Sequence, residues 1–298
     1  MSLQREKPLR CIQVGLGRWG ADWYREVVTR EPGVTVVAWV DSSHAALDAL
    51  QHSEGVPQER CHADLQSALR SEQAECVLLT ASLPGHVPIA LAALDAGLHV
   101  LMEKPFAESV ARAESVVEKA GETGRILMIS QNYRFYPAPQ RARRLVREQE
   151  LGRLGVIHVD FRRDHYTFSP SLEWHYNLPD PLIVDMAIHH FDLIRMVTGE
   201  DAERVRCSTW NPPYSSYRDV PAAEFTVQTK SGLTVTYRGS WTSTGRITPW
   251  AGEWHMEFEH GEASWASRAD TTGRGDWMRV LSAGSSTRRL PSGQLARP

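Results

Sequence analysis

The sequence lacks the cysteine patterns that mark a disulfide-stapled or zinc-binding protein. Its 298 residues include only four cysteines, which are scattered and form no CxxC pair: Cys11, Cys61, Cys76 and Cys207. A disulfide framework or a zinc knuckle needs closely spaced cysteines. The sequence therefore excludes both classes and is typical of a protein that works in a reducing cytoplasm.

A long apolar run, a secretory leader and a surplus of basic charge are also missing. No segment is apolar over a length that could span a bilayer, and no charged-then-apolar leader begins the chain. The formal net charge of −3 provides no electrostatic footprint for nucleic acid or an anionic membrane. An arginine cluster in residues 137–152 has helical spacing, and we interpret it as a solvated helix face. We expect a cytoplasmic protein that binds neither nucleic acid nor a membrane.

A glycine turn near the N-terminus is the first motif that indicates chemistry. A short apolar run leads into GLGRWG, whose glycines are Gly15, Gly17 and Gly20, and a helical pattern follows. In a dinucleotide-binding turn, the first glycine permits the tight turn and the second lets the backbone approach a pyrophosphate. The third allows close packing of helix and strand. The helix N-terminus then offers free N–H groups to the phosphates. A helix–strand turn without a ligand is the alternative.

A second apolar run, residues 34–40, ends on Asp41, where such folds hold the adenosine ribose. Its carboxylate would accept hydrogen bonds from the ribose hydroxyls and repel a 2′-phosphate. Ser42 and Ser43 supply no arginine to offset that charge, so we predict NAD rather than NADP. The residues expected to contact the cofactor here are Gly15, Gly17, Arg18, Trp19, Gly20, Asp41 and Ser42.

Strand and helix patterns alternate through residues 1–130. Apolar strands are expected at 76–80, 98–102 and 126–130, with a loop at 81–84. Repeated β–α units predict a doubly wound parallel sheet, so we assign this part of the chain to a Rossmann domain. Ligands of such sheets bind beyond the carboxyl ends of the strands.

One of those carboxyl ends carries Glu103, Lys104 and Pro105. A lysine at this place, beside the nicotinamide, could donate to a substrate oxygen or assist proton transfer. Its position before a proline favours an extended backbone. A surface lysine paired with Glu103 is the alternative interpretation.

The second half of the chain is organised around residues 180–199, DPLIVDMAIHHFDLIRMVTG, which we predict to be one helix. Asp180 can serve as its N-cap, Pro181 suits the first helical position, and Gly199 is placed to end it.

This predicted helix carries Asp185, His189 and Asp192, spaced by four and three residues and therefore on one stripe. A carboxylate one turn from an imidazole on a rigid element suits general acid–base catalysis. The alternative is a helix whose His and Asp side chains are satisfied by local hydrogen bonds.

Residues 131–298 are predicted to form an α+β domain with a mostly antiparallel sheet. Alternating segments lie at 156–163, 205–210, 223–229, 234–241, 254–259 and 263–267. Residues 268–298 show little periodicity and are expected to be irregular. Seven of the ten tryptophans lie beyond residue 150, and a sheet face that exposed them would favour a homodimer or homotetramer through this sheet.

Four motifs follow one another in a fixed order. They are the GLGRWG turn, His86-x₁₀-Gly97-Leu98-His99-Val100, Glu103-Lys104-Pro105 and Asp185-x₃-His189-x₂-Asp192. This combination resembles the Gfo/Idh/MocA family of NAD(P)-dependent oxidoreductases acting on sugars and polyols, from residue 9 to about 265. The resemblance implies a Rossmann domain followed by a substrate-binding and oligomerisation domain.

The resemblance also implies roles for individual residues. Lys104 would contact the reacting hydroxyl or carbonyl, Asp185 would bind substrate and His189 would be the general base. Asp192 would support the helix. Further cofactor contacts are expected from Thr80, His86, Glu103 and Lys104, and the substrate pocket is expected to be lined by Trp174 and His175.

Three departures from the family pattern affect the substrate pocket and the length. A glycine pair usual before the helix is Asp180-Pro181 here, and a frequent glycine is Ala187. Relatives usually continue for several tens of residues, so we expect either a short member or a missing segment. Substrate identity is therefore less transferable than the cofactor.

The predicted function is hydride transfer between NAD(H) and a sugar, inositol or related polyol. An enzyme that recycles NAD during glycoside cleavage or epimerisation is one alternative, and a non-catalytic dinucleotide-binding regulator is another. A metal site from Asp185, His175, His189 and His190 was considered, but no ligand motif of fixed spacing is present, and we predict none.

Overall fold

The computed structural model describes residues 7–164, 176–269, 275–284 and 288–291. Trp174 and His175, predicted to line the substrate pocket, lie outside these ranges. The chain divides into two compact units, Met1–Ser130 and Gln131–Pro298. No helix of the described residues is both long enough and apolar enough to cross a membrane.

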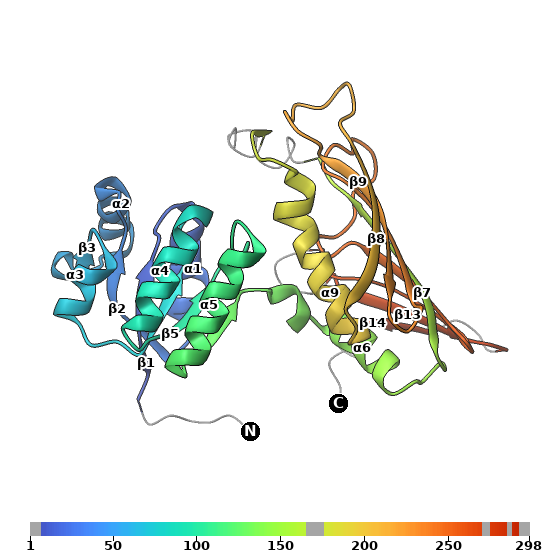
Figure 1. The fold of residues 1–298 in the computed structure, drawn as a ribbon, viewed down its shortest axis with the longest axis horizontal. Helices are drawn as coiled ribbons and strands as arrows, with labels where there is room; N and C mark the ends of the chain where they lie inside the picture. Colours follow the sequence, from blue (N-terminus) through green and yellow to red (C-terminus); the bar gives the residue numbers. More distant parts are fainter. Residues whose placement is uncertain (1–6, 165–175, 270–274, 285–287, 292–298) are drawn as a thin grey trace. The chain divides into compact units, whose positions relative to one another are not determined.

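The first unit is a six-stranded parallel sheet flanked by helices (Figure 1). Its strand order is β3-β2-β1-β4-β5-β6, and every pair is parallel. The strands are β1 (Leu9–Val14), β2 (Val34–Val40), β3 (Cys61–His62), β4 (Cys76–Leu79), β5 (His99–Met102) and β6 (Leu127–Ile129). The helices are α1 (Arg18–Glu26), α2 (His44–Glu54), α3 (Leu65–Ser71), α4 (Leu83–Asp95) and α5 (Val110–Thr123), with short 3₁₀ turns η1 (Val28–Arg30) and η2 (Gln58–Arg60). The order reverses between β1 and β4, which confirms the predicted doubly wound fold.

Local chemistry explains the helix boundaries of this unit. Ser43, Asp64 and Ser109 accept backbone N–H groups as the N-caps of α2, α3 and α5. The predicted loop at 81–84 is partly wrong, because α4 already begins at Leu83. Pro84 is tolerated there since the first turn does not need its missing N–H.

The second unit is built on an eight-stranded sheet with the order β14-β13-β12-β11-β7-β10-β9-β8. All neighbours are antiparallel except β7 and β10. The strands are β7 (Leu154–Arg162), β8 (Ala202–Trp210), β9 (Ala222–Thr229), β10 (Thr234–Ser240), β11 (Glu253–Phe258), β12 (Gly261–Ala266), β13 (Trp277–Ser282) and β14 (Arg288–Pro291). The helical segments are η3 (Asn132–Phe135), α6 (Pro137–Arg147), η4 (Leu182–Ala187) and α9 (Ile188–Thr198). The mostly antiparallel sheet is as predicted.

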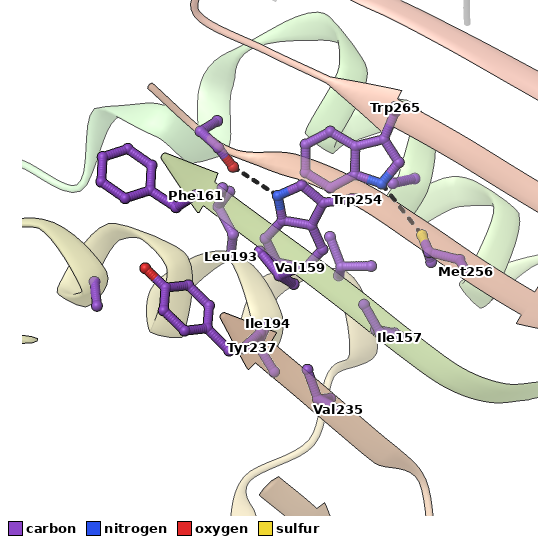
Figure 2. Close-up of a cluster of buried hydrophobic side chains, with 14 of the residues drawn as sticks. Ile157, Val159, Phe161, Leu193, Ile194, Val235, Tyr237, Trp254, Met256 and Trp265 are labelled. Atoms are coloured by element: carbon purple, nitrogen blue, oxygen red, sulfur yellow. Dashed lines mark hydrogen bonds between the residues drawn. The ribbon is translucent and has the colours of Figure 1, made fainter. Parts of the chain in front are cut away.

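The core of this unit lies between one sheet face and the helices α6 and α9 (Figure 2). Trp254 and Trp265 stack with ring centroids 4.6 Å apart. Their indole N–H groups donate to the carbonyl of Ala251 and to the sulfur of Met256. Along β7, β9, β10 and β11, alternate residues bury their apolar side chains on the core face of the sheet.

Two expectations about this unit are wrong. Residues 268–298 are not wholly irregular, because β13 and β14 extend the sheet beyond β12. Pairing of β13 with β12, and of β14 with β13, stabilises these strands, although their own pattern is weak. Among the described residues, tryptophans also do not form an exposed sheet face: Trp241, Trp254 and Trp265 are buried, and Trp210 on the edge strand β8 is 41% exposed.

Candidate active site

The glycine turn in the first unit has the geometry that a dinucleotide needs. Gly15 has φ +94°, and a Cβ there would lie 2.2 Å from the nitrogen of Ala81. A Cβ on Gly20 would lie 1.9 Å from the Gly15 oxygen. A Cβ on Gly17 would meet nothing within 4 Å. Two glycines are thus required by the packing of the turn, whereas the third leaves open space at the start of α1, as a bound pyrophosphate requires.

The side chains around this turn fall into two groups. Arg18 and Trp19, at the start of α1, are exposed and can reach a ligand. Thr80, which follows β4, is buried and donates its hydroxyl to the Gly15 carbonyl at 2.6 Å. Thr80 therefore supports the turn from behind. Whether it also contacts the cofactor stays a prediction.

Asp41 stands at the carboxyl end of β2, beside the glycine turn. Its Oδ2 accepts the N–H of Leu16 at 2.6 Å, and its Oδ1 accepts the N–H of Ser43 at 2.8 Å. These bonds fix the carboxylate next to the turn and leave lone pairs for two hydroxyls. Ser42, which lies between Asp41 and Ser43 in the sequence, is exposed. The arrangement fits an adenosine ribose.

Glu103 and its neighbours lie at the carboxyl end of β5. The buried Glu103 carboxylate accepts the indole N–H of Trp23 at 2.8 Å and the backbone N–H of Lys104 at 3.0 Å. His86 of α4 places its ring nitrogens 2.7 Å from the Pro105 carbonyl and 2.9 Å from the Ala81 carbonyl. Glu103 and His86 therefore hold the backbone of Lys104 in place, and the Lys104–Pro105 peptide bond is cis.

In the second unit, residues 180–199 differ from the single capped α-helix that was predicted. Asp180 has φ +43°, and its side chain does not cap the helix; its carbonyl accepts the N–H groups of Ile183 and Val184. The first turns, η4, are a π-helix, and α9 continues as an α-helix to the cap at Gly199. Asp185 sits in the π-helical part, so its stripe with the α9 residues is not the regular one that the spacing predicted. Such π segments are frequent at functional sites.

His189 is buried in the first turn of α9 and is held on two sides. Its Nδ1 lies 2.8 Å from Oε1 of Gln131. An amide oxygen only accepts, so Nδ1 is the donor in this hydrogen bond and Nε2 is the nitrogen that can exchange a proton with a ligand. The ring also stacks on Tyr133, with centroids 4.0 Å apart and planes 3° apart. This imidazole has a fixed orientation and a basic nitrogen, as a general base requires.

Asp192 lies one turn further along α9 and pairs with Arg134. The guanidinium Nε donates to Oδ2 at 2.9 Å, and a second contact joins the same two groups. This two-point pair ties α9 to η3. It agrees with the supporting role expected for Asp192.

Three residues of this site, Gln131, Tyr133 and Arg134, were not predicted from the sequence. They follow β6 directly and lie in and before η3, where they contact His189 or Asp192. Burial raises the pKa of Tyr133 to about 12, with a smaller rise from the charge of Asp185 and opposing effects of nearby arginines. The polar run QNYR after an apolar strand was the available signal.

The neighbouring His190 has a structural role. It is fully buried, with ring nitrogens 3.0 Å from the Tyr237 hydroxyl and 3.1 Å from the Trp250 carbonyl. His190 thus faces the core and not the surface that carries Asp185. Among the described residues, no group of three His, Cys, Asp or Glu side chains could hold a metal ion.

His190 makes the stability of the fold depend on pH. Burial lowers the pKa of His190 from its usual 6.5 to about 4, although the Trp250 carbonyl opposes the shift. The unfolded chain therefore takes up this proton at a higher pH than the folded chain, and stability is lost as the pH falls from 6.5 towards 4. Between pH 8 and pH 5 we expect this group to lower the free energy of unfolding by about 2 kcal/mol.

Urea unfolding at pH 8 and pH 5 measures that loss, with His190→Gln as the comparison because glutamine does not titrate. The difference between the two chains isolates the histidine from other titrating groups. An equal pH dependence in both chains would show that His190 is not neutral in the folded state.

Comparison with known proteins identifies both units. A family model described as the Gfo/Idh/MocA oxidoreductase family, NAD-binding Rossmann fold, matches residues 9–131. The model of the Gfo/Idh/MocA C-terminal domain matches residues 139–262.

Two of the similar proteins are named as inositol dehydrogenases. The scyllo-inositol 2-dehydrogenase (NAD(+)) of Bacillus subtilis (strain 168) is 26% identical over 80% of this chain and 69% of its own length. The inositol 2-dehydrogenase of Arthrobacter sp. (strain FB24) is 30% identical over 76% of this chain and 65% of its own length.

Solved structures share the fold. An inositol dehydrogenase homolog from Azotobacter vinelandii, complexed with NADH and myo-inositol, superposes with a TM-score of 0.83 at 21% identity. The match covers 96% of this chain and 76% of that one. An oxidoreductase from Agrobacterium radiobacter in complex with NAD⁺, L-tartaric acid and magnesium has a TM-score of 0.84 at 16% identity, over 96% and 80% of the two chains. With both of its domains matched, the chain belongs to the Gfo/Idh/MocA family and is an NAD-dependent oxidoreductase.

Proposed function

We propose that the protein transfers a hydride between NAD(H) and a CH–OH group of a sugar, an inositol or a related polyol. The observation that carries this proposal is the hydrogen bond from His189 Nδ1 to Gln131, which leaves Nε2 as a base. Relatives named inositol dehydrogenase support the class of substrate.

Each residue then has a defined task. His189 takes the hydroxyl proton through Nε2 as the carbon is oxidised, and returns it in the reverse direction. Lys104 and Asp185 hold and polarise the reacting group. Bound NAD supplies the hydride acceptor. Trp174 and His175 remain predicted contacts of the substrate.

Asp41 favours NAD over NADP in this proposal. Its carboxylate is fixed by two backbone N–H groups. A 2′-phosphate at this place would meet a negative charge, whereas ribose hydroxyls would find an acceptor. Arg18, Trp19, Ser42, Thr80, His86, Glu103 and Lys104 complete the proposed cofactor contacts.

Two further proposals concern assembly and location. We infer a homodimer or homotetramer through the sheet face that does not pack against α6 and α9. That face is polar, with Arg238 paired to Asp160 on neighbouring strands, and it would join a second copy by charged contacts. None of the four cysteines forms a disulfide, as a cytoplasmic location would favour.

The experiment that tests the function is a panel of polyols and sugars assayed with NAD and with NADP, read at the absorbance of the reduced cofactor. We expect substrate-dependent formation of NADH with at least one polyol. Cofactor binding without turnover of any member would favour a dinucleotide-binding regulator, and faster reduction of NADP would contradict the role of Asp41.

A further inference from the structure

Two arginines of the second unit lie over aromatic rings, and neither belongs to the machinery described above. Arg163 follows β7, is 3% exposed, and places its guanidinium 4.0 Å from the centre of the Trp250 ring. Arg268 follows β12, and its guanidinium lies over Tyr133 at 4.4 Å and over Tyr136 at 5.4 Å.

Tyr133 connects these arginines to His189. The imidazole stacks on one face of the Tyr133 ring. A single ring face cannot hold both groups at contact distance, so the Arg268 guanidinium lies on the opposite face. The charges that act on the Tyr133 hydroxyl are those of Arg268, Asp185 and Arg163. Two cations and one carboxylate therefore lie close enough to act on Tyr133, the residue that packs against the candidate base.

One N–H of the Arg268 guanidinium has no acceptor among the described residues. Its Nε is buried and has no hydrogen-bond partner in the described part of the chain. The two tyrosine rings offer only their π faces, which attract the charge but accept no strong N–H bond. Because arginine stays charged, leaving even one buried N–H of the guanidinium without an acceptor is costly. An anion at this place would supply the missing acceptors.

The backbone holds Arg268 at this position in spite of its conformation. Arg268 has φ +59°, a region that residues other than glycine rarely adopt. Its N–H donates to Asp276 at 3.0 Å, and its carbonyl accepts the N–H of Trp250 at 3.2 Å. Backbone strain of this kind concentrates at sites where function requires one placement. Trp250 is also the ring under Arg163, so one element positions both guanidinium groups.

We propose that Arg268 and Arg163 form an anion-binding subsite next to Tyr133, across whose ring His189 lies, and that the substrate is an acidic polyol. This inference rests on the proposed function, since it places the anionic group on the molecule that His189 deprotonates. A guanidinium presents a planar fork of donors that matches a carboxylate or a phosphate at two points. The substrate would be a uronic or aldonic acid, or a sugar phosphate.

Matched neutral and anionic substrates distinguish a carboxylate from a phosphate as the group that the subsite binds. The probes are D-glucose, D-glucuronate and D-glucose 6-phosphate, with the corresponding galactose series, each assayed for NAD reduction. We expect one anionic form to exceed its neutral counterpart by about 10- to 100-fold in kcat/KM, the effect of one charge-assisted interaction. The better of the two anions identifies the group. Equal kcat/KM for neutral and anionic forms would overturn the subsite.

Variants of Arg268 assign the effect to that residue. Arg268→Met keeps the apolar stem over the tyrosines but removes the charge, and should remove the advantage of the anionic substrate through KM. Arg268→Lys should restore part of it. Arg279→Met is the matched control, because Arg279 is an exposed arginine near another aromatic ring, Trp277, on β13. An unchanged preference in Arg268→Met would contradict the assignment.

A binding measurement keeps the subsite testable if no probe is oxidised. Calorimetry with D-glucuronate and with D-glucose 6-phosphate, in the presence of NADH, should detect binding of one anion that weakens about tenfold or more in Arg268→Met. Such a result without turnover would contradict the proposed oxidation of these probes and retain the subsite. Turnover of neutral polyols together with no anion binding would overturn the subsite and retain the oxidation.

Discussion

Replacing His189 with glutamine is expected to lower kcat for NAD reduction by about 10²- to 10⁴-fold, the usual contribution of a general base. Glutamine approximates the length of the imidazole and can still bond to Gln131, but it offers no basic nitrogen in place of Nε2. Steady-state rates with the best polyol of the panel measure the effect. NAD binding should be unchanged, because the nucleotide-binding turn belongs to the first unit.

His158→Gln is the matched control for this experiment. His158 lies on β7, on the sheet face opposite to the core, where its Nδ1 is 2.6 Å from the Thr236 hydroxyl. We expect its kcat to equal that of the unmodified protein. A loss of less than threefold in His189→Gln would mean that another group takes the proton.

Substitutions in the glycine turn are expected to have the second large effect. Two similar glycine-to-alanine changes in this turn should give different results. Gly17→Ala should leave the free energy of unfolding nearly unchanged, because its φ of −57° suits alanine and its Cβ would meet nothing within 4 Å. The same Cβ would occupy the proposed pyrophosphate position. We therefore expect the stabilisation by NAD, about 2.7 kcal/mol at a hundredfold excess over Kd, to disappear.

Gly20→Ala should instead destabilise the first unit. Its Cβ would lie 1.9 Å from the Gly15 carbonyl, and overpacking of this kind costs about 1–3 kcal/mol or more. Thermal unfolding of both variants with and without NAD makes the comparison. Full stabilisation of Gly17→Ala by NAD would contradict the placement of the pyrophosphate at this turn.

The parallel sheet and its nucleotide turn could be predicted because their determinants are local. Strands β2 and β4 are short apolar runs, and Gly15 and Gly20 stand where packing leaves no room for a Cβ. Local sequence patterns did not predict the features that depend on strand pairing or on packing between distant segments. Strand β13 is held by its register with β12, and Trp254 is buried by helices distant in sequence.

The candidate base could be predicted from its spacing, but its surroundings could not. Asp185 and His189 are four residues apart in the sequence, whereas Gln131 and Tyr133 reach His189 from a segment about 58 residues away. The spacing of the residues also does not predict the π-helical segment that contains Asp185. Arg268 lay in a region expected to be irregular, and its position depends on β12 and on the bonds to Trp250 and Asp276.

The most direct measurement of the central claim is the amount of NADH formed compared with the amount of substrate consumed over many turnovers. The account predicts one NADH for each CH–OH group oxidised, with no product when NAD is omitted. Product that accumulates without NADH would contradict it and would indicate an enzyme that reduces its NAD again within each catalytic cycle.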